Sequence, residues 1–133
     1  MKMAKKTEAR RIGDIGEAAA AQYLAKKGYH ILERNYRIYE GEIDIIAADS
    51  EYIVFAEVKT RNTNSLDRPS SAVNIKKQKK IILTAVHYLA EHENDLQPRF
   101  DIIEIIYDKK TKMIISMEHI ENAFIQTGEY GVY

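Results

Sequence analysis

Cysteine is absent from the sequence, so disulfide bonds and thiolate metal sites are excluded, while the redox compartment is left open. No apolar run approaches the roughly 18 residues of a transmembrane helix, and the basic start of the chain lacks the apolar segment of a signal peptide. We therefore expect a cytoplasmic protein without a membrane partner. The sequence also lacks internal repeats, a glycine-rich phosphate loop and a Ser/His/Asp constellation. The four scattered histidines are interpreted as ordinary side chains.

An excess of either charge is missing as well, because 20 basic residues balance 20 acidic ones. Zero net charge argues against a nucleic-acid partner, but the charges are unevenly distributed. Basic residues crowd segments 2–11 and 59–80, and the acidic surplus lies in segment 91–121. This asymmetry permits a basic face, although an overall basic domain would be stronger evidence for nucleic-acid binding.

The length of 133 residues and the 45% hydrophobic content fit a single domain with one packed core. We expect a flexible basic N-terminus (1–11), one domain (12–126) and a C-terminal tail (127–133). Hydrophobic patterns and turn residues predict the following elements: a helix over 12–27, a strand over 29–39, a hairpin over 41–61, a polar flap over 62–71, a helix from a cap at Ser70 or Ser71 to about His92, strands over 99–107 and 113–117, and a short helix over 118–125.

The order of these elements predicts an α/β fold. A strand–helix–strand crossover through residues 70–92 makes at least one pair of strands parallel. The expected architecture is therefore a mixed sheet of about five strands with helices on both faces.

The hairpin carries charge where charge is costly, with Asp44 in its first strand and Glu57 and Lys59 in its second. Glu57 and Lys59 share a face because side chains alternate along a strand. A four-residue loop over 49–52 sets Asp44 opposite Glu57, with Cβ atoms roughly 5 Å apart. A three-residue loop without a bulge would place the two acids on opposite faces.

Two carboxylates at that distance raise each other's pKa unless a cation lies between them. Mg²⁺ suits this role, since it takes carboxylate oxygens and keeps several waters. Lys59 could then orient or help deprotonate a metal-bound water, as phosphodiester hydrolysis requires. The alternative is structural: Glu57 simply pairs with Lys59 or Arg61 at a strand end.

Other charged residues carry similar alternatives. Glu17 lies on an otherwise small or apolar helical stripe, either as a functional acid or as a glutamate favoured by the helix dipole. Arg34 and Arg37 either face phosphate or are solvated. Five consecutive polar residues wrap the start of the second helix, so one or two approach the core or a ligand unless the segment is a solvated helix end: Lys76, Lys77, Gln78, Lys79 and Lys80.

Two segments support a resemblance, Gly41-Glu42-Ile43-Asp44 and Val54-Phe55-Ala56-Glu57-Val58-Lys59-Thr60-Arg61. With Gly16-Glu17, Arg34-Asn35, Lys77-Gln78 and Arg99-Phe100-Asp101, they resemble the YraN-like family of uncharacterised bacterial proteins. The match extends from about Arg11 to Phe124. That family looks like the restriction-endonuclease-like (PD-(D/E)xK) nuclease superfamily, and is nearest to its Holliday-junction-resolvase branch.

The resemblance implies a restriction-endonuclease-like fold and a nuclease site. Asp44 and Glu57 would ligate Mg²⁺ or Mn²⁺ with the Val58 carbonyl, and Lys59 would assist the attacking water. Glu17 matches an acidic helical residue of the resolvase branch, as a catalytic residue or metal ligand, and Gln78 matches a polar catalytic position. Ile43 stands where the signature often has proline.

The leading hypothesis is thus a metal-dependent endonuclease acting on DNA, with branched or otherwise structured duplex as a candidate substrate. The alternatives are a nucleic-acid-binding module without turnover and a protein-interaction subunit with a vestigial site. Expected phosphate contacts are Arg34, Arg37, Arg61, Lys76, Lys77 and Lys80. A homodimer is a further expectation, from hydrophobic residues taken to be exposed near the C-terminus: Phe124, Ile125, Tyr130, Val132 and Tyr133.

Overall fold

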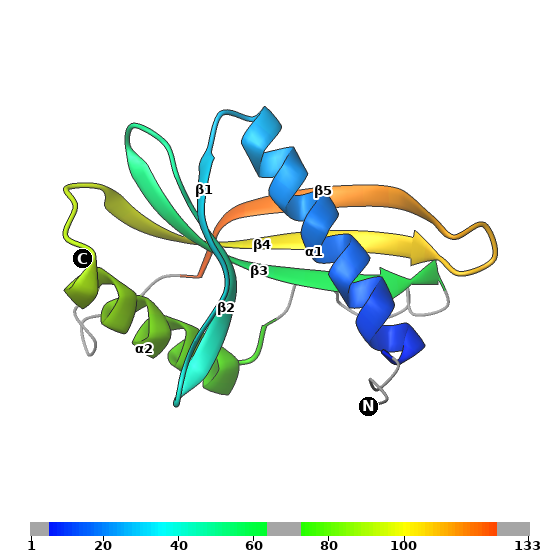
Figure 1. The fold of residues 1–133 in the computed structure, drawn as a ribbon, viewed down its shortest axis with the longest axis horizontal. Helices are drawn as coiled ribbons and strands as arrows, with labels where there is room; N and C mark the ends of the chain where they lie inside the picture. The colour runs from blue at the N-terminus through cyan, green and yellow to red at the C-terminus, as the bar shows by residue number, and fades with distance from the viewer. Residues whose placement is uncertain (1–5, 64–72, 125–133) are drawn as a thin grey trace, which may run out of the picture.

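The computed structural model describes residues 6–63 and 73–124, which form two helices and one five-stranded sheet. Figure 1 shows the arrangement of these elements. In chain order they are α1 (Glu8–Lys26), β1 (His30–Ile38), β2 (Gly41–Ala48), β3 (Tyr52–Asn62), α2 (Ile75–Glu91), β4 (Gln97–Asp108) and β5 (Met113–Phe124).

The strands lie in the order β1-β2-β3-β4-β5. All neighbouring pairs are antiparallel except β3 and β4, which are parallel and are connected through α2. The expected α/β fold with a mixed sheet is therefore confirmed, and the crossover produces the parallel pair as anticipated.

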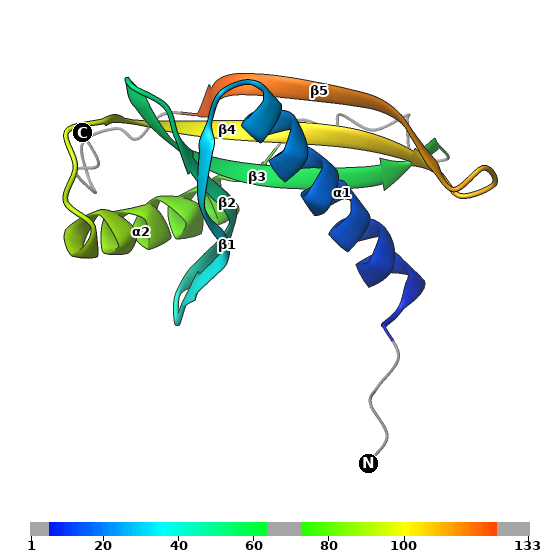
Figure 2. The same cartoon turned by 45° about the horizontal axis from the view of Figure 1, so that its top comes forward.

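Each face of the sheet is covered by one helix. On one face, Leu24 of α1 packs against Ile45, Val54 and Ile103 of the sheet. On the other face, Ile82 and Tyr88 of α2 pack against Phe55 and Phe100. Successive residues of β3 thus contribute to opposite cores, as strand alternation requires. The turn of the β1–β2 hairpin extends away from β3, β4 and β5 in both views (Figures 1 and 2).

Helix α1 lies unusually close to β3 at Gly16. A Cβ atom at this position would overlap the side chain of Thr60, so only glycine permits the observed approach. The helix begins at Glu8, four residues before the predicted start at Ile12, because the Thr7 hydroxyl accepts the backbone N–H of Arg10 and forms an N-cap. Residues 8–11 are therefore helical, and not part of a flexible N-terminal segment.

The start of α2 also differs from the prediction. Asn74 caps the helix, and its side chain accepts the backbone N–H of Lys77 at 2.8 Å. Ser70 and Ser71, the expected caps, lie outside the described residues, as does most of the predicted flap over 62–71. The cap prediction was wrong because asparagine is as good an N-cap as serine and stands nearer the apolar pattern.

The predicted helix over 118–125 was wrong, because β5 continues to Phe124. Ile120 pairs with Ile102 and Phe124 pairs with Phe100 across the sheet. Phe124 is buried, so it does not supply the exposed surface expected for a dimer. The other four residues of that expectation and the tail over 127–133 lie outside the described part.

The described segments contain no helix that could span a membrane. Neither α1 nor α2 is long and apolar enough to cross a bilayer.

Candidate functional site

The hairpin that carries the acidic residues has the predicted register. The carboxylate of Asp49 accepts the backbone N–H groups of Glu51 and Tyr52 at 2.9 and 2.7 Å, which fixes the turn. The strands pair from Ile45 with Ala56 to Ala48 with Ile53. The predicted four-residue loop over 49–52 is therefore confirmed. Continued by one residue beyond the paired segment, this register places Asp44 level with Glu57.

Asp44 lies where β2 separates from β3. The backbone pairing of the two strands ends at Ile45, and the next bond is made by a side chain, with the Val58 N–H donating to Asp44 Oδ2 at 2.8 Å. Between Asp44 and its start at Gly41, β2 lies away from β3 (Figure 1). The carboxylate therefore replaces a backbone acceptor at the fork between the strands.

The two acids at this fork interact strongly. Burial and the neighbouring Glu57 carboxylate raise the pKa of Asp44 to about 7. Glu57 is itself buried, with a side chain that is 9% exposed. Ionising both acids together is unfavourable in this setting unless positive charge is supplied.

Lys77 of α2 supplies a positive charge. Its Nζ atom lies 2.7 Å from Glu57 Oε1. Burial acts to lower the pKa of Lys77, but the hydrogen bond and the charge of Glu57 outweigh it and the pKa is raised. Lys77 was assigned to phosphate binding from the sequence, and its ion pair with Glu57 was not foreseen.

Lys59 lies two residues after Glu57 in β3, so the two side chains share the sheet face that α2 packs on. In the parallel pairing with β4 it stands beside Glu104. Glu104 is buried at 8% exposure, and among the described residues its Oε2 atom has no hydrogen-bond partner. Sequence reasoning missed this acid, although an acidic residue in the otherwise apolar run 102–106 was a usable signal.

Glu17 approaches the acidic pair from α1. Its carboxylate lies 3.6 Å from the guanidinium of Arg34 and is 14% exposed. Burial raises its pKa, and the charge of Asp44 adds to the effect. Glu17 therefore belongs to the electrostatic surroundings of Asp44, and Arg34 offsets part of the negative charge.

Among the described residues, Gln78 forms no hydrogen bond with Asp44 or Glu57. Its side-chain amide donates to the Val73 carbonyl oxygen at 2.7 Å, which ties the start of α2 to the preceding chain. The N–H of Val58 bonds Asp44, while the expected role of its carbonyl in metal binding stays a prediction.

The donor chemistry at the fork fits a hard divalent cation in part. Two carboxylates with an unfavourable mutual charge are what Mg²⁺ or Mn²⁺ neutralises, and these ions complete their shells with water. Within residues 6–63 and 73–124, however, no group of three or more histidine or acidic side chains is placed to bind a metal. Asp44 and Glu57 would thus hold the ion without Glu17.

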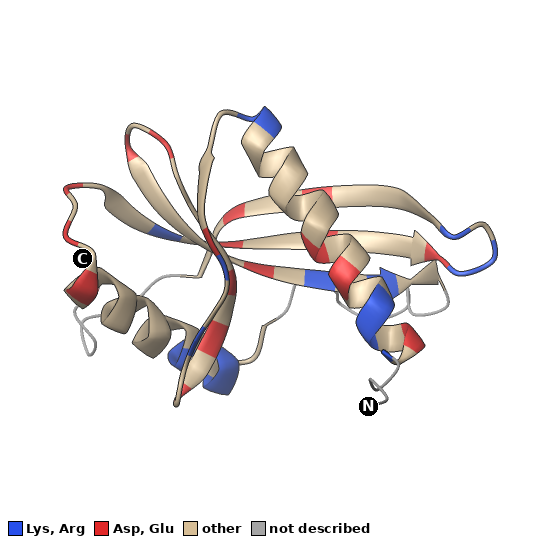
Figure 3. Ribbon diagram, viewed as in Figure 1, with Lys and Arg blue, Asp and Glu red and all other residues tan. Residues whose placement is uncertain are grey.

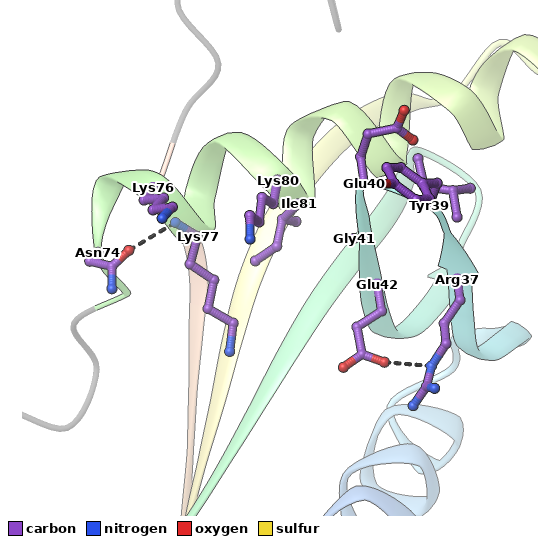
Figure 4. Close-up of a pocket in the computed structure, with 11 residues that line it drawn as sticks. Arg37, Tyr39, Glu40, Gly41, Glu42, Asn74, Lys76, Lys77, Lys80 and Ile81 are labelled. Carbon is purple, nitrogen blue, oxygen red and sulfur yellow. Dashed lines mark hydrogen bonds and ion pairs between the residues drawn. The ribbon is translucent and has the colours of Figure 1, made fainter.

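Four of the six predicted phosphate-binding residues line one pocket of about 650 Å³ between the β1–β2 hairpin and the start of α2. These four are Arg37, Lys76, Lys77 and Lys80 (Figure 4). Arg37 is paired with Glu42 at 2.7 Å, and Lys77 is paired with Glu57 at 2.7 Å. Lys76 and Lys80 are therefore the basic lining residues that form no ion pair within the described part of the chain. Figure 3 shows basic residues at the start of α2 and, separately, in β3 and in the β4–β5 turn at the other end of the sheet. Arg34 and Arg61 are not part of the pocket lining.

A second polar cluster lies under α1 and was not anticipated. Asp101 is fully buried and accepts two hydrogen bonds from Arg99, at 2.9 and 2.8 Å. It also accepts from His119 Nε2 at 2.7 Å and from the Asn122 N–H at 2.9 Å. Hydrogen bonds from His119 and Arg99 hold the pKa of Asp101 low although burial acts to raise it. His119 thus has a structural role in this cluster.

The raised pKa of Asp44 predicts a pH-dependent stability. Between its ordinary value of 3.8 and about 7 the folded state holds a proton that the unfolded state has lost, so stability falls as pH rises through this window. We expect Asp44→Asn to stabilise the protein by roughly 2–4 kcal/mol at about pH 8 without divalent ions. The gain should disappear toward pH 4. Urea denaturation at the two pH values measures it, and an equal effect at both would contradict the assigned cause.

The described part of the chain is thus an α/β protein with an acidic pair at the fork of two strands of a mixed sheet. Its sequence belongs to the family described as "Uncharacterised protein family UPF0102", whose model matches residues 16–105. This confirms the resemblance to the YraN-like family.

Bacterial relatives support the same assignment. A UPF0102 protein of Caldanaerobacter subterraneus is 46% identical over 121 residues, covering 90% of this chain and 99% of the relative. A UPF0102 protein of Alkaliphilus oremlandii is 48% identical over 119 residues, covering 86% of this chain and 98% of the relative. One from Acetivibrio thermocellus is 45% identical over 127 residues, covering 92% and 98%.

Proposed function

We propose that this protein is a metal-dependent endonuclease that hydrolyses phosphodiester bonds of DNA. The observation that carries the proposal is the pairing of the partly buried Asp44 with the buried Glu57 on adjacent strands. Burial and the charge of Glu57 together raise the pKa of Asp44. A buried acidic pair whose charges conflict is a common mark of a functional site.

Each residue of the site has a role in this proposal. Asp44 and Glu57 hold Mg²⁺ or Mn²⁺, which supplies Lewis-acid activation of water and neutralises developing charge. Lys59, on the same sheet face as Glu57, orients the attacking water or stabilises the anionic transition state. The lysines at the start of α2 bind phosphates beside the acids.

The sheet order and the acidic pair at the fork support placing the family in the restriction-endonuclease-like superfamily. Within it, Glu17 near Asp44 supports the resolvase branch and hence a branched or otherwise structured DNA substrate.

A cleavage panel tests the proposal. Linear duplex, single-stranded DNA, a four-way junction and matching RNAs are incubated with Mg²⁺, Mn²⁺ or a chelator, using the wild type and Lys59→Ala. We expect metal-dependent cleavage that is strongest on the junction and is lost in Lys59→Ala. Equal cleavage by both proteins would remove Lys59 from the mechanism.

A binding module without turnover is the second candidate. The ion pair between Lys77 and Glu57 favours it, because this pair compensates the acidic charge without a metal. Such a module would bind nucleic acid with an affinity that falls steeply with salt. Binding that survives Asp44→Ala, without cleavage under any metal, would favour this candidate over the nuclease.

A further inference from the structure

Lys77 takes part in two environments at once. Its ammonium group bonds Glu57 at 2.7 Å, and its side chain also lines the pocket between α2 and the β1–β2 hairpin. In Figure 4 the side chain extends from α2 into the space between these elements. About half of the side chain, 52%, is exposed, so it has room to change partners.

We propose that Lys77 couples DNA binding to metal binding, an inference that rests on the proposed function. In the free protein Lys77 occupies the acidic pair and competes with the divalent ion. A DNA phosphate in the pocket draws the ammonium away from Glu57. The released carboxylates then accept the metal next to the bound strand.

The charges around Lys77 favour this competition. The negative groups that act on Lys77 are Glu57, Asp44 and Glu42, in that order of effect. Glu42 is already paired with Arg37, so the acidic pair at the fork is the main competitor for the ammonium. A metal bound at this pair would stand close to Lys77, and two cations that share one site repel.

The backbone around Lys77 is held in place, so the proposed change of partner involves only the lysine side chain. Asn74 fixes the N–H of Lys77 at the helix cap. A Cβ atom added to Gly41 would lie 2.9 Å from Thr84 Oγ1 and 3.2 Å from the Lys80 carbonyl oxygen, so the hairpin is packed tightly against α2. Both walls of the pocket are therefore held in place, and the flexible stem of lysine provides the movement.

Lys76 provides the matched comparison. It lines the same pocket, and among the described residues it forms no ion pair with an acidic side chain, in contrast to Lys77. Replacing either lysine by methionine removes one positive charge from the pocket and keeps most of the side-chain volume. Only replacement of Lys77 removes the competitor of the metal.

The test measures Mn²⁺ affinity by electron paramagnetic resonance, with and without a short phosphorothioate DNA duplex that resists cleavage. In the wild type we expect DNA to tighten Mn²⁺ binding. In Lys77→Met without DNA, Mn²⁺ should bind roughly five- to tenfold more tightly than in the wild type, the scale of one lost ion pair. Adding DNA should then increase the Mn²⁺ affinity of this variant much less than it does in the wild type. Lys76→Met weakens DNA binding but should keep the wild-type Mn²⁺ affinity without DNA, and its coupling is compared with that of the wild type at saturating duplex. Lys77→Arg should keep the coupling.

Linkage provides an independent check, because Mn²⁺ must raise DNA affinity by the same factor that DNA raises Mn²⁺ affinity. Unchanged or weaker Mn²⁺ binding in Lys77→Met would overturn the inference. It would also be overturned if DNA tightened Mn²⁺ binding in Lys77→Met as much as in the wild type, which is the result expected if a DNA phosphate ligates the metal directly. Absence of Mn²⁺ binding in every variant would overturn both the inference and the proposed metal site. Coupling without cleavage would support the inference and refute the nuclease.

Discussion

Replacing Asp44 by asparagine is expected to lower metal-dependent DNA cleavage at least about 100-fold, the scale of losing one group that stabilises transition-state charge. Asparagine keeps the shape of the side chain and an oxygen that can accept the Val58 N–H. It removes the negative charge that would hold the metal. The loss should therefore appear as weaker Mn²⁺ binding and slower cleavage, and not as unfolding.

Glu33→Gln is the matched control for this prediction, because Glu33 is an exposed acidic residue on the neighbouring strand β1. It removes one negative charge and should leave cleavage within about twofold of the wild type. Single-turnover cleavage of the best substrate, measured with denaturation curves for each variant, separates the two effects. Comparable losses in both variants would point to a general charge effect and against a role for Asp44.

The largest effect on stability is expected from Asp101→Ala, at about 3–5 kcal/mol, the range for breaking a buried ion pair. The substitution leaves the Arg99 guanidinium, His119 and the N–H of Asn122 without their shared acceptor. Arg99 remains stacked over the ring of Tyr52 at 4.7 Å, but a stacked ring does not replace a carboxylate. Urea denaturation near neutral pH measures the loss.

Glu121→Gln tests whether burial is the reason. Glu121 lies 3.4 Å from the same arginine, but its side chain is 51% exposed. An exposed ion pair contributes less than about 1 kcal/mol, so this variant should resemble the wild type. A loss in Asp101→Ala no larger than that in Glu121→Gln would show that Asp101 does not hold the strands together.

The sequence was sufficient for the local part of the site. Strand alternation places Glu57 and Lys59 on one face, and the length of the turn decides whether Asp44 stands opposite Glu57. Both rules act over a few residues, so no tertiary information was needed. The crossover that makes β3 and β4 parallel followed from the order of the elements for a similar reason.

Contacts between distant elements were beyond such rules. Lys77 reaches Glu57 from the first turn of α2, 20 residues later in the chain, and basic patterning alone favours solvent or phosphate as its partner. Asp101 meets the Asn122 N–H because β5 is irregular opposite β4 between Phe100 and Ile102.

The incorrect helix over 118–125 has a related cause. The spacing of four between Ile120 and Phe124 fits one face of a helix, but it is also a multiple of the two-residue period of a strand. Pairing with β4 decides between the two interpretations, and a single segment does not contain that information.

The bond from Val58 to Asp44 makes one amide proton a spectroscopic reporter of the fork. The acceptor of this proton changes from carboxylic acid to carboxylate as pH passes through about 7. The nitrogen and proton resonances of Val58 should therefore follow the ionisation of Asp44, and would shift again when a cation takes over that charge. Events at the fork thus become visible in solution without any substrate.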